Sequence, residues 1–153
     1  MPIVDLPDEA ATAALAARIS ALADVGDVIA LKGDLGSGKT SFARSFIRAR
    51  GPAEEVPSPT FTLVQIYELG SVAIWHFDLY RLKSPEEAWE LGIEDAINEG
   101  ISLIEWPERL GPLLPVRRLE IEFLFGEQPE ARRAVLDPGG NWQARLAGIA
   151  ADA

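Results

Sequence analysis

The chain has 153 residues, and its 14 basic and 24 acidic side chains give a formal net charge of −10. This charge disfavours nucleic acid as a direct, tightly held ligand, because phosphate binding needs clustered lysine and arginine. The lack of cysteine and the single histidine, His76, exclude a disulfide scaffold, a thiol nucleophile and a zinc site of several histidines. The sequence has no apolar run near the ~18 residues of a membrane span and no signal-peptide pattern. We therefore expect one cytoplasmic domain over residues 1–153, without membrane association.

The first third of the chain predicts strand, helix, strand, glycine-rich turn and helix. Residues 3–6 form a short apolar run, and a helix is expected from about Asp8, which can accept a hydrogen bond from a free first-turn amide. Residues 27–31 (DVIAL) form a short run that is apolar after Asp27, which is typical of a buried strand. After a turn rich in glycine, a helix is expected over residues 39–50, ended by Gly51 and Pro52.

The rest of the chain predicts two hairpins with short helices and one buried strand between them. Ser84-Pro85-Glu86-Glu87 is typical of a helix start, with serine at the cap and glutamate three positions later. The expected elements, in chain order, are strands 60–68 and 72–78, a helix from Ser84 to Gly92, a helix over 93–99, a strand over 101–104, and strands 119–125 and 131–136.

Residues 33–40, GDLGSGKT, match the phosphate-binding pattern G-x-x-x-x-G-K-[ST] at each fixed position. Glycines let successive backbone N–H groups turn toward a polyphosphate, and the helix that follows adds its positive dipole end. Lys39 would place a charge on the β- and γ-phosphates, and Thr40 would offer its hydroxyl to Mg²⁺. The sequence therefore predicts a P-loop NTPase-like α/β fold, a mixed parallel and antiparallel sheet with helices on both faces.

Two acidic residues stand where predicted strands end. Glu105 follows the apolar run 101–104, and Asp78 ends the run 72–77. Ligands bind at this carboxyl edge in open α/β sheets, so either carboxylate could serve Mg²⁺ or a water, the alternative being a solvated strand end. His76 shares a strand face with Asp78 by alternation, and we favour a structural role for it. Trp106 could stack on a base or pack in the core.

Two further segments remain open to more than one interpretation. Tyr80 and Arg81 could orient phosphate or a partner, or simply pack at the surface. Thr60 and Thr62 lie where a loop sensing the γ-phosphate would sit, but threonine is also common in strands.

The sequence favours ATP over GTP, because none of its three lysines stands in the guanine-reading N-K-x-D context. A small-molecule kinase would usually have an arginine-rich lid, whereas Arg44, Arg48 and Arg50 lie on the loop's own helix. A small ATPase that works through a protein partner fits best. The alternatives are a small P-loop kinase and an ATP-dependent assembly factor with incidental hydrolysis.

Several segments together resemble the bacterial TsaE family, formerly YjeE, the ATPase component of tRNA threonylcarbamoyladenosine biosynthesis. The order and spacing agree over about residues 5–125. The matching segments are LPDE at 6–9 with Ala11 and Thr12, GDLGSGKT at 33–40, SPTFTLV at 58–64, HFDLYRL at 76–82 and EWP at 105–107.

The resemblance implies an ATP- and Mg²⁺-binding protein that hydrolyses ATP slowly alone and joins a TsaB–TsaD pair. In that pair TsaD transfers threonylcarbamoyl to N6 of adenosine 37 in tRNAs reading codons that begin with A, so tRNA would be met only through partners. The resemblance places Lys39 and Asp78 with Glu105 as catalytic residues, and Thr40 with Glu105 as metal ligands. It places Ser58, Thr60 and Thr62 in a switch. The expected nucleotide-binding residues are Thr12, Asp34, Leu35, Gly36, Ser37, Gly38, Lys39, Thr40, Ser41 and Trp106.

Overall fold

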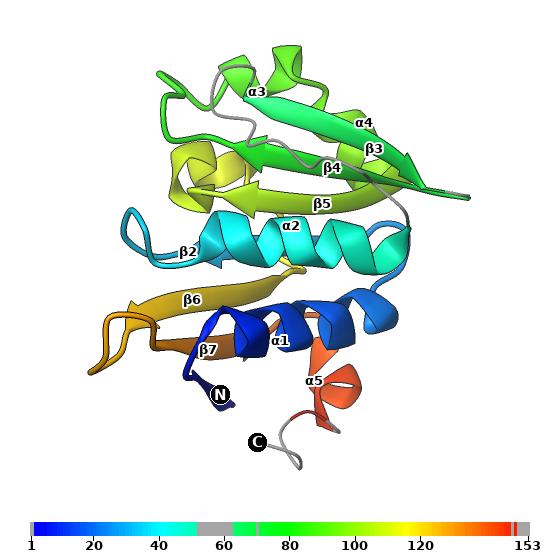
Figure 1. Cartoon of the computed structure of the whole chain (residues 1–153). Helices are drawn as coiled ribbons and strands as arrows, with labels where there is room; N and C mark the ends of the chain where they lie inside the picture. Colours follow the sequence, from blue (N-terminus) through cyan, green and yellow to red (C-terminus); the bar gives the residue numbers. More distant parts are fainter. Residues whose placement is uncertain (1, 52–62, 70, 148, 150–153) are drawn as a thin grey trace.

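The computed structural model describes residues 2–51, 63–69, 71–147 and 149, and within them the chain forms one mixed sheet flanked by helices (Figure 1). The strands are β1 (Ile3–Leu6), β2 (Val28–Lys32), β3 (Val64–Leu69), β4 (Val72–Asp78), β5 (Gly100–Glu105), β6 (Leu119–Phe125) and β7 (Arg132–Pro138). The α-helices are α1 (Glu9–Leu22), α2 (Lys39–Arg50), α3 (Glu87–Glu90), α4 (Ile93–Glu99) and α5 (Trp142–Arg145), and η1 (Pro107–Leu113) is a 3₁₀ helix.

The sheet has the strand order β1-β7-β6-β2-β5-β4-β3. Its centre is parallel, because β2 pairs with both β5 and β6, and β4 pairs with β5 in the same direction. Its edges are antiparallel, where β3 pairs with β4 and where β7 joins β6 to β1. The carboxyl ends of β2, β5 and β4 therefore meet at one edge of the sheet.

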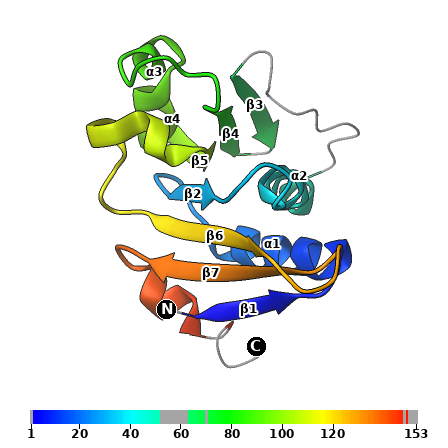
Figure 2. The same ribbon diagram turned by 90° about the vertical axis from the view of Figure 1, so that its left-hand side faces the viewer.

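Helices cover both faces of the sheet, which confirms the expected α/β class (Figure 2). On one face α1 and α2 pack through side chains such as Leu15 and Phe46 into a core that includes Ile29 of β2 and Ile121 of β6. On the other face α4 and η1 pack against β4 and β5, where Ile93 belongs to a second buried cluster. Strand β2 is buried on both faces over residues 28–31, as its uninterrupted apolar sequence predicts.

Capping residues and glycines in the sequence predicted most of the helix boundaries. Asp8 has extended φ/ψ and its Oδ1 accepts a hydrogen bond of 2.9 Å from the Ala11 amide, so it caps α1 as expected. Helix α1 ends at Leu22, four residues before Gly26, the glycine that the sequence offers as a helix end. At the end of α1, a guanidinium nitrogen of Arg50 donates to the Ser20 carbonyl at 2.7 Å. No described helix is long and apolar enough to cross a membrane.

The helix expected from Ser84 is shorter than the sequence indicated. Helix α3 begins only at Glu87, and the residues before it form a turn. The capping contact is nevertheless present, because Glu87 Oε1 accepts hydrogen bonds from the amides of Lys83 and Ser84, each at 3.1 Å. The following helix α4 has the expected bounds, and Gly92 precedes it with a left-handed φ of 83°.

Candidate functional site

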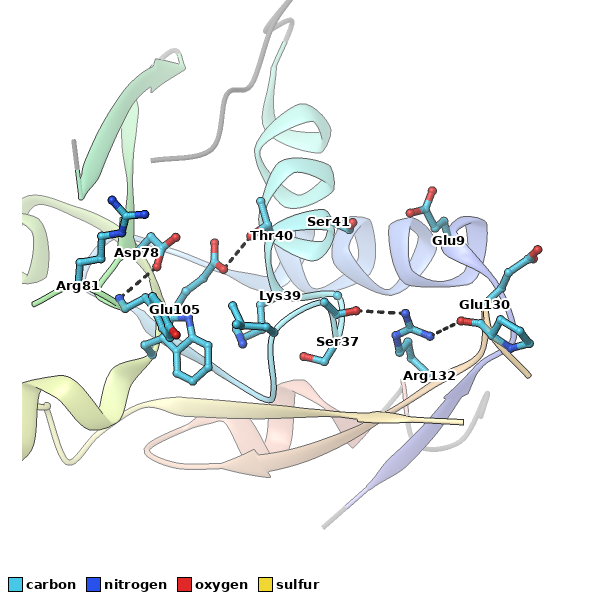
Figure 3. A pocket seen from close by; sticks show the side chains of 16 residues that line it. Glu9, Ser37, Lys39, Thr40, Ser41, Asp78, Arg81, Glu105, Glu130 and Arg132 are labelled. Atoms are coloured by element: carbon cyan, nitrogen blue, oxygen red, sulfur yellow. Dashed lines mark hydrogen bonds between the residues drawn. The ribbon is translucent and has the colours of Figure 1, made fainter. Parts of the chain in front are cut away.

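A cavity of about 590 Å³ opens at the carboxyl edge of the parallel strands. The loop after β2 and the first turn of α2 form its centre. Figure 3 shows Asp78 and Glu105 on one side of Lys39, and Glu130 and Arg132 on the other. The lining residues are Glu9, Leu35, Gly36, Ser37, Gly38, Lys39, Thr40, Ser41, Asp78, Tyr80, Arg81, Glu105, Trp106, Pro129, Glu130 and Arg132.

The loop before α2 needs its glycines for backbone reasons. Gly33, Gly36 and Gly38 have φ values of 141°, 78° and 113°, which side chains rarely adopt. A Cβ on Gly33 would lie 2.7 Å from the Phe123 carbonyl oxygen, whereas a Cβ on Gly36 would meet nothing within 4 Å. Gly38 caps α2 without a side-chain hydrogen bond, so the first-turn amides of α2 have no side-chain cap and can receive an anion.

Lys39 lies inside the site and is only 4% exposed. Its Nζ donates to the carbonyls of Gly33 and Asp34, the latter at 3.1 Å, and lies 3.8 Å from the centroid of the Trp106 ring. Burial lowers the pKa of Lys39 below its ordinary value, and nearby carboxylates, led by Glu105, oppose this shift. The ammonium group is thus held by the loop's own carbonyls, inside the cavity.

Thr40 and Glu105 meet at the mouth of the loop. Thr40 Oγ1 donates a hydrogen bond of 2.8 Å to Glu105 Oε1 (Figure 3). Asp78 pairs with Glu105 in the parallel register of β4 and β5, so the two carboxylates leave the sheet side by side. Asp78 Oδ1 also accepts a hydrogen bond of 3.2 Å from the Tyr80 amide.

The oxygen atoms at this point fit Mg²⁺, which prefers hydroxyl, carboxylate and phosphate oxygens and keeps several waters. Thr40 and Glu105 supply two such oxygens beside a phosphate-binding loop. Among the described residues no group of three or more histidine, cysteine, aspartate or glutamate side chains could hold a metal ion. Two protein oxygens suit a metal that takes its remaining ligands from water and a bound phosphate.

Glu105 has a second buried partner. His76 Nε2 lies 2.7 Å from Glu105 Oε2, and both side chains are almost fully shielded from solvent. The face shared by His76 and Asp78, expected from strand alternation, is the face that carries α2.

The structure brings most of the expected site residues together in one cavity, with two differences. Thr12 is buried in α1 and does not line the cavity, while Glu9, one turn earlier, does. Asp34 does not line the cavity either, but its carbonyl accepts a hydrogen bond from Lys39. Ser58, Thr60 and Thr62 lie outside the described residues.

One side of the cavity has no counterpart in the sequence prediction. The turn between β6 and β7 contributes Pro129 and Glu130, and the first residue of β7 contributes Arg132. Arg132 Nη2 donates to the Gly36 carbonyl at 3.1 Å, across 96 positions of sequence. No local motif marks such a residue, because the contact exists only once the hairpin has folded back over the loop.

Three features define a protein of the P-loop class: a sheet with a parallel centre, a G-x-x-x-x-G-K-T loop between β2 and α2, and acidic residues at neighbouring strand ends. Comparison with known families agrees and is more specific. The model of the family described as threonylcarbamoyl adenosine biosynthesis protein TsaE matches residues 6–135. The chain belongs to this family.

Individual relatives support the assignment. A tRNA threonylcarbamoyladenosine biosynthesis protein TsaE from Rickettsia felis is 44% identical over 117 residues, which cover 76% of this chain and 68% of the relative. The protein of the same name from Bacillus subtilis is 39% identical over 116 residues, covering 75% and 71%. The crystal structure of YdiB from Bacillus subtilis superposes with a TM-score of 0.76 at 27% identity, covering 98% of this chain and 93% of that one.

Proposed function

We propose that the protein binds and slowly hydrolyses ATP with Mg²⁺. It works with the TsaB–TsaD pair in forming N6-threonylcarbamoyladenosine at position 37 of tRNAs that read codons beginning with A. Family membership supports the pathway. The observation that carries the nucleotide chemistry is the hydrogen bond between Thr40 and Glu105 at the uncapped start of α2, beside the glycine loop. These two oxygens are suited to Mg²⁺ and lie beside the loop that would bind the triphosphate.

Phosphate binding falls to the loop and to Lys39. The amides at the start of α2 have no side-chain cap, and the positive end of the helix dipole favours an anion there. Lys39 lies within the cavity lining, and its ammonium would leave the carbonyls of Gly33 and Asp34 for the β- and γ-phosphates. Trp106 and Glu9 line the same cavity and would border the rest of the nucleotide.

Hydrolysis would depend mainly on position and charge. Thr40 and Glu105 would hold Mg²⁺, which when bound neutralises charge on the β- and γ-phosphate oxygens. Asp78 stands beside Glu105 at the end of the next strand and is 8% exposed, so it would orient an attacking water and accept its proton. The protein forms no covalent intermediate in this scheme.

The proposed function depends on the TsaB–TsaD pair as partners. The protein would not transfer the threonylcarbamoyl group itself, since TsaD of the partner pair would do so. Its net charge of −10 fits a component that reaches tRNA through other proteins. Ser58, Thr60 and Thr62 would act as a switch that responds to partner binding, and a partner arginine could stabilise transition-state charge, an effect worth ~10³-fold in rate. We propose that the protein acts in the cytoplasm.

Three variants test the assignment. Lys39→Ala should lose most nucleotide affinity, whereas Glu105→Ala and Asp78→Ala should lose turnover more than binding. Glu122→Ala is the matched control, because Glu122 is exposed on β6 away from the cavity. The measurements are binding of a non-hydrolysable ATP analogue and release of phosphate. Equal turnover in the native protein and in Glu105→Ala would remove Glu105 from the mechanism, and transfer of labelled γ-phosphate to an acceptor other than water would indicate a kinase instead.

A further inference from the structure

His76 contacts Glu105 on the side of the carboxylate away from Thr40. It is fully buried on β4, two residues before Asp78, and so faces the side of the sheet that carries α2. In the parallel register it pairs with Leu103, and Glu105 stands two residues further along β5 on the same face. The imidazole is therefore placed behind the carboxylate, away from the open cavity that Glu105 lines.

The contacts of His76 form a short chain to the first turn of α2. Because an ionised carboxylate only accepts hydrogen bonds, His76 Nε2 is the donor to Glu105 Oε2 at 2.7 Å. His76 Nδ1 has no hydrogen-bond partner within the described parts of the chain. The other carboxylate oxygen, Glu105 Oε1, accepts from Thr40 at 2.8 Å. Each oxygen of Glu105 is thus held by a different element, Oε2 by β4 and Oε1 by α2.

We propose that His76 is a positioning residue, which fixes the Glu105 carboxylate so that Oε1 faces Thr40 and the metal. The inference rests on the proposed function, in which Thr40 and Glu105 hold Mg²⁺. A glutamate side chain has several rotatable bonds, and its last torsion is broad, so without a partner on Oε2 the carboxylate would sample many orientations. Partners that orient metal-binding carboxylates are typically worth 10–100-fold in metal affinity or activity.

A packing role alone would not require this residue type. The neighbours of His76 on the same face of the sheet, Ile74 and Leu103, are apolar and belong to the core. An apolar side chain would fill the space, but it would leave Glu105 Oε2 buried without a donor. Exchanging the donor while keeping the volume therefore separates positioning from packing.

The test uses the full-length protein with a non-hydrolysable ATP analogue, and it measures metal affinity directly. Mn²⁺ binding to the protein–nucleotide complex is followed by electron paramagnetic resonance, and analogue binding is measured with Mg²⁺ and with a chelator. We expect His76→Leu to weaken Mn²⁺ affinity by about 10-fold or more while leaving metal-free analogue binding nearly unchanged. His76→Gln should retain most of the metal affinity, because its amide can place an N–H close to the position of Nε2. Ser102→Ala is the control, since Ser102 is a buried polar residue of β5 on the opposite face, and its hydroxyl has no hydrogen-bond partner among the described residues.

The outcomes separate this inference from the proposed function. If Glu105→Gln weakens Mn²⁺ binding and folded His76→Leu does not, the positioning role is overturned and the metal site stands. If Glu105→Gln also leaves Mn²⁺ affinity unchanged, the metal site itself is wrong, and the inference falls with it. If His76→Leu does not fold, the shorter His76→Asn replaces it. Weaker metal binding in His76→Asn than in His76→Gln supports the inference, and equal affinity in the two contradicts it.

Discussion

At the scale of single residues, Lys39 is a buried lysine at the centre of the site, with a lowered pKa. Its ammonium is buried, held by the carbonyls of Gly33 and Asp34, and placed over the ring of Trp106. Burial lowers the pKa of Lys39, because desolvation penalises the charged form more than the surrounding carboxylates favour it. The residue that should bind the most negative part of a nucleotide is thus easier to deprotonate than an ordinary lysine.

This shift predicts a pH dependence of nucleotide binding. A lowered pKa means that Lys39 loses its proton at a lower pH than the ordinary value of 10.5, and the neutral amine binds phosphate weakly. The affinity for a non-hydrolysable ATP analogue should therefore fall as the pH rises from 7 toward 10. Lys39→Arg is the control, because a guanidinium stays charged throughout this range. Its affinity should be lower but nearly constant, and an equal fall in both proteins would contradict the assignment.

At the scale of elements, the glycine loop combines two demands on the backbone. Gly33 has a positive φ and lies against the Phe123 carbonyl, whereas Gly36 has a positive φ with open space above it. We expect Gly33→Ala to lower the free energy of unfolding by more than Gly36→Ala, for which the left-handed conformation alone costs about 1–2 kcal/mol. Urea denaturation of both variants measures the difference. Equal losses would show that the close contact at Gly33 relaxes freely.

The start of α1 offers a second test at this scale. Asp8 accepts a hydrogen bond from the Ala11 amide and caps a helix that contributes Leu15 and Ile19 to the core. Asp8→Ala should destabilise the protein by about 1 kcal/mol, whereas Asp8→Asn should stay close to the native protein because asparagine caps equally well. Thermal unfolding monitored by circular dichroism compares the three proteins. A loss of the same size in Asp8→Asn would show that charge, rather than the hydrogen bond, stabilises the helix start.

At the scale of the whole molecule, one ion pair ties the C-terminal helix to the start of the central strand. Arg145 of α5 donates two hydrogen bonds to Asp27, at 2.6 and 2.9 Å, and a third at 3.0 Å to the Leu22 carbonyl at the end of α1. Hydrogen bonds to charged partners that are mostly shielded are worth about 1.5–3 kcal/mol. Arg145→Met should therefore lower the free energy of unfolding by about 2 kcal/mol in urea denaturation. Arg133→Met is the control, because the ion pair of Arg133 with Asp5 is largely exposed and should contribute little.

The sequence predicted those features of the molecule that depend on residues close together in the chain. The bounds of α2 and α4 followed from the glycines beside them, Gly51 after α2 and Gly92 before α4. The phosphate loop followed from a motif whose residues are consecutive. The position of Asp78 and Glu105 at one sheet edge also followed, because acids after buried parallel strands share that edge.

What the sequence did not predict depends on contacts between distant segments. Nothing near Ile3 indicates that β1 will pair with β7 at residue 135, and nothing near Arg132 indicates its hydrogen bond to Gly36. The contact of His76 with Glu105 needs the parallel register of β4 and β5, which strand sequences alone do not fix. The structure supplied these relationships by setting the order and register of the strands.

We propose that this protein is an ATPase whose site becomes fully competent only with its partners. The most direct test is the rate of ATP hydrolysis with Mg²⁺, measured for the protein alone and with the TsaB–TsaD pair, using Lys39→Ala with the same pair to subtract any contaminating activity. We expect slow hydrolysis by the protein alone and a stimulation of at least about 10-fold by the pair. A rate that the pair leaves unchanged would contradict it and would leave a free-standing ATPase.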